Sequence, residues 1–226
     1  MKRMHMPKTA ARLAAALFAL ILLTAAAPAR AGEAAVPAPQ MAYEAVLETY
    51  RTALGGDEAA LEAREGAWLA WVCVDGSDTD PLRAVGYAFI DLNADGSPEL
   101  VIGETGADSG RLIFEILTLQ NGEPVTAKLG WDRYQVSLIY DPLAARFGYY
   151  AEGSSGAANS VFECAWAGPD LTQWPDMLQI EFNGDFETGE ETWTLGDAVI
   201  TEEAAAAIIG AWQRLLLPLP LHPFAE

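Results

Sequence analysis

Two stretches near the start of the chain place apolar residues at the spacing of an α-helix. In residues 42–54, the apolar face consists of Ala42, Val46, Leu47, Tyr50 and Leu54. In residues 57–72, Asp57 can cap the first turn, and the apolar stripe consists of Leu61, Trp68, Leu69 and Val72. Gly55-Gly56 separates the two predicted helices, and Gly66 is expected to weaken the second one in its middle.

The pattern changes to short apolar runs after the break at Asp75–Pro81. The runs are rich in β-branched and aromatic residues, and they cover residues 84–90, 99–103, 111–120, 124–131, 133–140, 145–152, 160–168 and 177–182. Asn121-Gly122 lies between two of them and is a strong hairpin signal. Because no helix intervenes, the runs predict an antiparallel meander and not βαβ units.

The last predicted element is a helix that begins after Thr201. Thr201 can cap it, Glu202 and Glu203 suit its positive N-terminal end, and the prolines at 218 and 220 stop it. The sequence therefore predicts an α+β fold. A mainly antiparallel sheet of about six to eight strands, in meander order, would be flanked by two N-terminal helices and one C-terminal helix.

The N-terminal segment has the features of a secretory signal peptide. A basic start is followed by an apolar run over residues 13–27, and Ala29-Arg30-Ala31 matches the small-x-small cleavage pattern. The apolar run is shorter than the roughly 20 residues of a membrane helix, so no membrane span is expected after cleavage. We therefore expect residues 1–31 to be a signal peptide, 32–40 a flexible lead-in and 41–226 a single domain that is secreted.

Removal of residues 1–31 would make the chain more acidic. The whole chain has 13 basic and 32 acidic residues, a formal charge of −19. Five of the basic residues and none of the acidic ones lie in 1–31, which leaves 8 against 32, a formal charge of −24. This charge argues against nucleic acid and anionic membranes as partners. It suits divalent cations, cationic partners or solubility alone.

Two cysteines, Cys73 and Cys164, remain after cleavage. In an exported protein they can form a disulfide, which would contribute about 4–5 kcal/mol in the chain-entropy model. Two buried thiols are the alternative, because the sequence does not show whether the sulfurs approach each other.

The segment DLNADGSPELVIG, residues 91–103, alternates acidic or amide side chains in the manner of a calcium-binding loop. Gly96 stands where such a loop turns sharply, and the expected ligands are Asp91, Asn93, Asp95, Ser97 and Glu99. An EF-hand needs a glutamate at the twelfth position, which is Ile102 here, and its flanks are helices, whereas these read as strands. The expectation is therefore a strand–loop–strand Ca²⁺ site that acts as a structural clip. A metal-free turn is the alternative, because Asp and Asn also bond their own backbone.

The loop DLNADGSPEL resembles the calcium loops of FG-GAP and integrin-type propeller blades. It is more similar still to a group of uncharacterised secreted bacterial proteins with a D-x-D-x-D-G-x-P-E-L strand–loop–strand motif. Weaker similarities to that group lie at Gly148–Ser160, at the predicted C-terminal helix and at the chain end LHPF. The resemblance implies calcium between two strands, and it provides no activity that can be transferred to this chain. Asn93 replaces the more common Asp, which removes one charge, and the motif occurs once, which excludes a multi-blade propeller from this chain alone.

A small-residue turn at Gly153–Ser160 is the remaining candidate site. It misses the G-x-S-x-G pattern of a nucleophile elbow by one position, and His222 is the only histidine after residue 31. We assign no catalytic residue and expect this turn to line a ligand groove through Gly153, Ser154, Ser155 and Gly156.

These features favour a secreted, non-catalytic extracellular protein held by calcium. Two other functions stay open. One is an extracellular glycan-active hydrolase that uses a carboxylate pair, and the other is a glycan-binding module built on the strand aromatics. The partner would then be an extracellular glycan or protein. The oligomeric state is not predicted.

Overall fold

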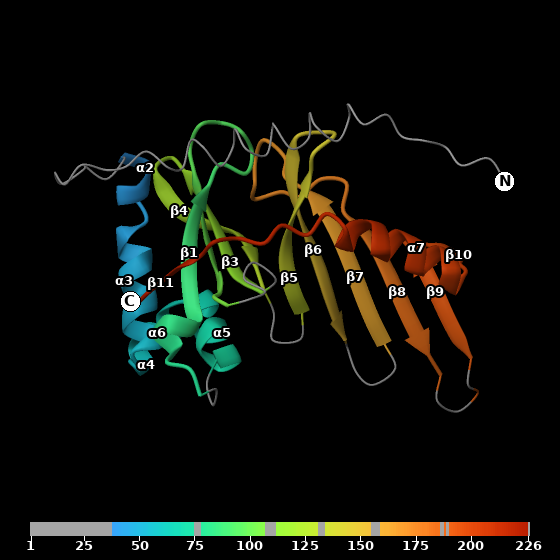
Figure 1. Ribbon diagram of the computed structural model, residues 1–226, viewed down its shortest axis with the longest axis horizontal. Helices are drawn as coiled ribbons and strands as arrows, with labels where there is room; N and C mark the ends of the chain where they lie inside the picture. Colours follow the sequence, from blue (N-terminus) through green and yellow to red (C-terminus); the bar gives the residue numbers. More distant parts are fainter. Residues whose placement is uncertain are drawn as a thin grey trace, which may run out of the picture. The chain divides into compact units, whose positions relative to one another are not determined.

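Antiparallel strands that follow one another along the chain form two sheets (Figure 1). This computed structural model describes residues 38–74, 78–106, 112–130, 134–154, 159–185, 188 and 190–225. The predicted signal peptide and most of the predicted lead-in lie outside the described residues. The α+β class and the meander order are confirmed, but the strands divide into two sheets, which the hydrophobic pattern did not indicate.

The first sheet has the strand order β11-β1-β2-β3-β4. It contains β1 (Val85–Ile90), β2 (Glu99–Glu104), β3 (Ile113–Gln120), β4 (Glu123–Leu129) and β11 (His222–Pro223). The hairpin expected at Asn121-Gly122 joins β3 to β4, with both residues at positive φ, 54° and 84°. These angles suit the tight two-residue turn that the Asn-Gly pair predicts.

The second sheet has the order β10-β9-β8-β7-β6-β5. It contains β5 (Tyr134–Asp141), β6 (Arg146–Ser154), β7 (Asn159–Trp166), β8 (Leu178–Gly184), β9 (Glu191–Leu195) and β10 (Ala198–Ile200). Each strand pairs with the next one along the chain, so the register follows from short connections.

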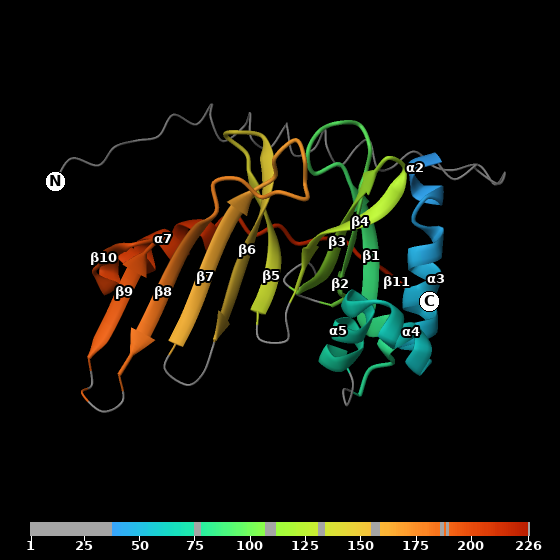
Figure 2. The same cartoon turned by 180° about the vertical axis from the view of Figure 1, so that it is seen from behind.

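The N-terminal helices lie beside the first sheet (Figures 1 and 2). They are α2 (Ala38–Met41), α3 (Glu44–Leu54), α4 (Glu58–Ala63), α5 (Glu65–Val74) and α6 (Pro81–Ala84). Asp57 caps α4 as expected, by accepting a hydrogen bond from the backbone N–H of Ala60. The predicted second helix is divided, because Arg64 adopts an extended conformation between α4 and α5. The division therefore falls at Arg64 and not at Gly66.

The C-terminal helix α7 (Glu202–Gln213) covers part of the second sheet, and Thr201 caps it by accepting from the N–H of Ala204. After α7 the chain returns to the first sheet, where Tyr87 pairs with His222 (Figure 2). On the way, Leu216 bridges to Ile139 in β5. The tail thus connects the two sheets through backbone contacts.

Three apolar clusters stabilise this arrangement. One packs the N-terminal helices on the first sheet, and another packs α7 on the second. The cluster between them joins the sheets, with Val101 and Ile116 from one side and Val136, Leu138 and Tyr149 from the other. Among the described residues, no helix has the length and apolarity to cross a membrane.

Candidate functional site

The predicted calcium loop connects β1 to β2 and is organised by its own side chains. The Asp91 carboxylate accepts from the N–H groups of Asp95 and Gly96 at 3.1 and 3.0 Å. Asp95 accepts from the N–H of Ser97 at 2.7 Å, and Asn93 accepts from the N–H of Asp95 at 3.2 Å. Gly96 has a φ of 89°, which provides the sharp turn expected at this position.

Glu99, the last predicted ligand, is almost fully buried, with 1% of its surface exposed. Its carboxylate accepts from the N–H of Leu92 at 2.8 Å and from the hydroxyl of Thr118 at 3.1 Å. Burial raises the pKa of Glu99 to about 7, and the nearby charges of Asp95 and Asp91 add to the rise, while its two hydrogen bonds oppose it. Within the described chain, no basic side chain forms an ion pair with Glu99.

The side-chain oxygens of the loop therefore accept hydrogen bonds from backbone N–H groups of the same loop. In the described part of the chain, no three or more histidine, cysteine, aspartate or glutamate side chains are grouped to hold a metal. The backbone N–H of Ser97 is bonded to Asp95. Calcium at this loop would have to take carboxylate oxygens that now accept from N–H groups.

The loop also contacts the second sheet. The amide of Asn93 donates to the backbone oxygen of Pro169 at 3.2 Å and to Asp95 at 3.1 Å. Pro169 lies in the connection between β7 and β8, and the indole N–H of Trp174 in this connection donates to the oxygen of Ala127 in β4 at 2.9 Å. The acidic loop between β1 and β2 thus contacts the connection between β7 and β8 of the second sheet.

A second polar contact between the sheets contains Lys128. Its Nζ lies 3.7 Å from Glu163 Oε2 and 4.1 Å from the ring centre of Tyr149. Burial lowers the pKa of Lys128, and the charge of Glu163 opposes this effect. The Tyr149 hydroxyl donates to Glu163 at 3.4 Å. This group joins β4 to β6 and β7.

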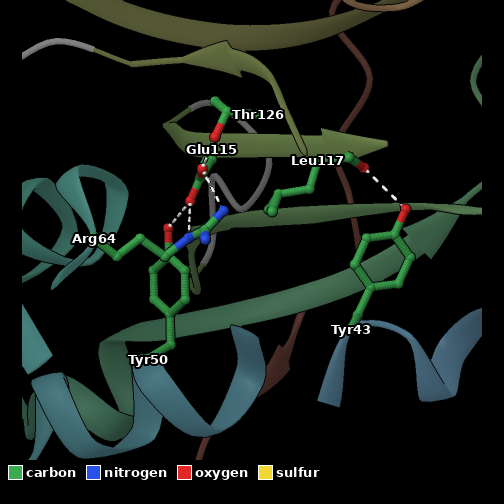
Figure 3. A network of polar contacts seen from close by, with 6 residues as sticks. All are labelled: Tyr43, Tyr50, Arg64, Glu115, Leu117 and Thr126. Atoms are coloured by element: carbon green, nitrogen blue, oxygen red, sulfur yellow. Dashed lines mark hydrogen bonds and ion pairs between the residues drawn. The ribbon is translucent and has the colours of Figure 1, made fainter. Parts of the chain in front are cut away.

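Sequence analysis did not single out Glu115, the second buried glutamate, in β3. Its carboxylate accepts from Arg64 at 2.7 and 2.8 Å, from the Tyr50 hydroxyl at 2.6 Å and from the Thr126 hydroxyl at 2.6 Å (Figure 3). Tyr43 donates nearby to the oxygen of Leu117 at 3.3 Å (Figure 3). Burial and the adjacent carboxylate raise the pKa of Tyr50, so the phenol stays protonated. The partners of Glu115 are 11 to 65 residues away in the sequence, so no local sequence pattern predicts this network.

The predicted ligand turn is described only at its start. Gly153 and Ser154 are the last residues of β6, whereas Ser155 and Gly156 lie outside the described residues.

The disulfide considered from the sequence is not formed. Cys73 is exposed on α5 beside the first sheet, and Cys164 is buried in β7 under α7. The two cysteines belong to elements that pack in different clusters, so their sulfurs do not meet. Burial raises the pKa of the Cys164 thiol to about 11.

Comparison with known proteins gives no relative. No family model, curated protein or solved structure matches the chain.

Proposed function

We propose that this is a secreted, non-catalytic extracellular protein in which the loop between β1 and β2 binds Ca²⁺ as a structural clip. The observation that carries the proposal is the buried Glu99 carboxylate, which has two aspartates near it and no basic partner among the described residues. A buried charge is costly unless it is neutralised. The protein has two means of neutralising this one, a proton or a cation.

Calcium is the cation that fits the available donors. Carboxylate and amide oxygens suit a hard dication, and the side chains of Asp91, Asn93, Asp95 and Glu99 would supply them. The backbone carbonyl oxygen of Ser97 would be a further ligand. Since Asn93 already contacts Pro169, ordering the loop would also strengthen its contact with the second sheet. The clip would then act on the interface of the two sheets.

Secretion rests on the N-terminal sequence, and it has its own test. Expression with the native N-terminus in a bacterial host should release a protein whose first residue is Gly32. An exported product that keeps residues 1–31 would contradict the signal peptide.

Thermal unfolding in calcium and in chelator tests the clip. Extracellular calcium sites bind with Kd of about 10⁻⁴–10⁻³ M, so 5 mM calcium should add about 1–2 kcal/mol and raise Tm by about 2–8 °C. Asp95→Ala should lose this shift. Asp197→Ala is the matched control, because Asp197 is an exposed acid in the turn between β9 and β10.

The metal-free turn is the second candidate for this loop, and the amide bonds of Asp91 and Asp95 favour it. In that case calcium leaves Tm unchanged in every variant, and Asp95→Ala lowers Tm equally with calcium and with chelator. Equal calcium shifts in Asp95→Ala and Asp197→Ala would indicate screening of the acidic surface and would also contradict the clip.

A further inference from the structure

A polar cavity of about 290 Å³ lies where the end of α7 meets the edge of the second sheet. Its lining residues are Gln135, Ser137, Tyr150, Glu152, Gln213 and Leu216. A volume of this size is at the lower end of the range for small-molecule sites, which is about 300–1,000 Å³.

The strand register explains how the lining residues come together. Gln135 pairs with Glu152 and Ser137 pairs with Tyr150, so the alternation of side chains places all four on the same face of β5 and β6. On the same side of the sheet, α7 ends at Gln213, and Leu216 then bridges to β5. The cavity is therefore formed where α7 stops covering the sheet.

The Tyr150 hydroxyl holds the polar groups of the cavity in position. It donates to Glu152 Oε2 at 2.5 Å and accepts from the Gln213 amide at 3.2 Å. Burial and the Glu152 carboxylate raise the pKa of Tyr150, so the hydroxyl keeps its proton. In these two hydrogen bonds Glu152 uses one carboxylate oxygen and Gln213 uses its amide nitrogen.

The charge of the cavity favours a cationic ligand. Among the lining residues that the structure describes, Glu152 is the only charged side chain, and no basic residue in the described parts of the chain forms an ion pair with it. The chain as a whole has a formal charge of −19. An anion would therefore be repelled, whereas a cation would gain a partner in a partly desolvated site.

The aromatic lining argues against a sugar. Carbohydrate rings commonly stack on an exposed aromatic face, but Tyr150 is only 3% exposed and its ring packs in the cluster beneath α7. Tyr150 is the only aromatic residue among the described residues of the lining, and these residues offer hydrogen bonds and charge without a stacking surface.

We propose that this cavity binds a small organic cation with a primary ammonium group. Glu152 is the charge partner, and the amide oxygens of Gln135 and Gln213 accept hydrogen bonds from the ammonium. This site is separate from the acidic loop, and it does not depend on calcium.

Calorimetric titration in the presence of a chelator tests the proposal with three probes of equal chain length. 1,4-Diaminobutane should bind with a stoichiometry near one, while 1,4-butanediol and succinate should show no saturable binding. Glu152→Gln should weaken diaminobutane binding at least tenfold. The matched control, Glu62→Gln, removes the same charge from an exposed position on α4 and should leave binding unchanged.

A second variant separates the cavity from general attraction to an acidic surface. Gln135→Ala keeps the charge and alters only an exposed side chain of β5, so it should fold and should weaken binding several-fold. Equal binding of butanediol would overturn the ammonium assignment. No saturable binding of diaminobutane, or equal losses in Glu152→Gln and Glu62→Gln, would overturn the site itself.

Discussion

Glu99 in β2 and Glu115 in β3 are buried to the same degree, but only Glu115 is paired with a guanidinium group. Each of the two residues is 1% exposed. Arg64 donates to Glu115 from two nitrogens, whereas Glu99 accepts only from a backbone N–H and a threonine hydroxyl. The fold thus neutralises one buried acid internally and leaves the other to a proton or to an external cation.

Removal of the Arg64 guanidinium should destabilise the protein strongly. Arg64→Met leaves the Glu115 charge buried without a positive partner, although the Tyr50 and Thr126 hydroxyls still donate to it. The expected cost is about 3–5 kcal/mol in chemical denaturation. Arg51→Met is the control, because its pair with Glu48 is exposed and worth less than about 1 kcal/mol. Equal losses in the two variants would contradict the role of the buried pair.

Gly66 should not tolerate a methyl group. A Cβ there would collide with Glu115 Oε2 and the Tyr50 hydroxyl, so Gly66→Ala should cost about 2 kcal/mol or more despite the higher helix propensity of alanine. At Gly210 in α7 the nearest atom would be Arg214 Nη1 at 3.6 Å. Gly210→Ala should therefore be neutral or stabilising by up to about 1 kcal/mol. A stable Gly66→Ala variant would show that the Glu115 network is not closely packed.

The two cysteines should differ in reactivity. Cys73 is exposed, while burial holds the pKa of Cys164 at about 11, so little thiolate forms there at pH 8. Iodoacetamide should label the native protein at Cys73, and Cys164 only after unfolding, as peptide mass spectrometry would show. Recovery of a Cys73–Cys164 disulfide from the purified native protein would contradict the structure.

Stability without calcium should depend on the protonation of Glu99. The pKa of Glu99 is raised from 4.5 to about 7 on folding, so the folded state keeps a proton that the unfolded state has released. Stability should therefore fall as the pH rises from about 4.5 to 7, by up to about 3 kcal/mol. Glu99→Gln resembles the protonated form and should lack this component. Parallel pH profiles for the two proteins in chelator would show that Glu99 ionises normally.

Local signals predicted local structure well. Asp57 and Thr201 cap their helices, and Asn121-Gly122 forms its hairpin, because the determinants lie within a few residues of each other. The division into two sheets was not predicted. From β1 to β10 each strand pairs with the next one in the chain except at β4 and β5, and the hydrophobic pattern does not show that pairing stops there. That boundary arises from packing across the sheets.

The candidate site shows the same limit. The acidic loop and its sharp turn at Gly96 were evident from spacing. The burial of Glu99, the contact from Asn93 to Pro169 and the pairing of Arg64 with Glu115 depend on residues that meet only in the folded chain. The unexpected division between α4 and α5 falls at Arg64. The backbone of Arg64 is extended there, and its side chain donates to Glu115.

Direct titration of calcium into the metal-free protein at pH 7.5 tests the central claim, that a cation neutralises the buried Glu99. We expect saturable uptake of one calcium ion with a Kd of about 10⁻⁴–10⁻³ M and release of a fraction of a proton. Binding should be lost in Glu99→Gln and in Asp95→Asn, and retained in Asp197→Asn. Absence of saturable uptake, or retention of it in Glu99→Gln, would contradict the account.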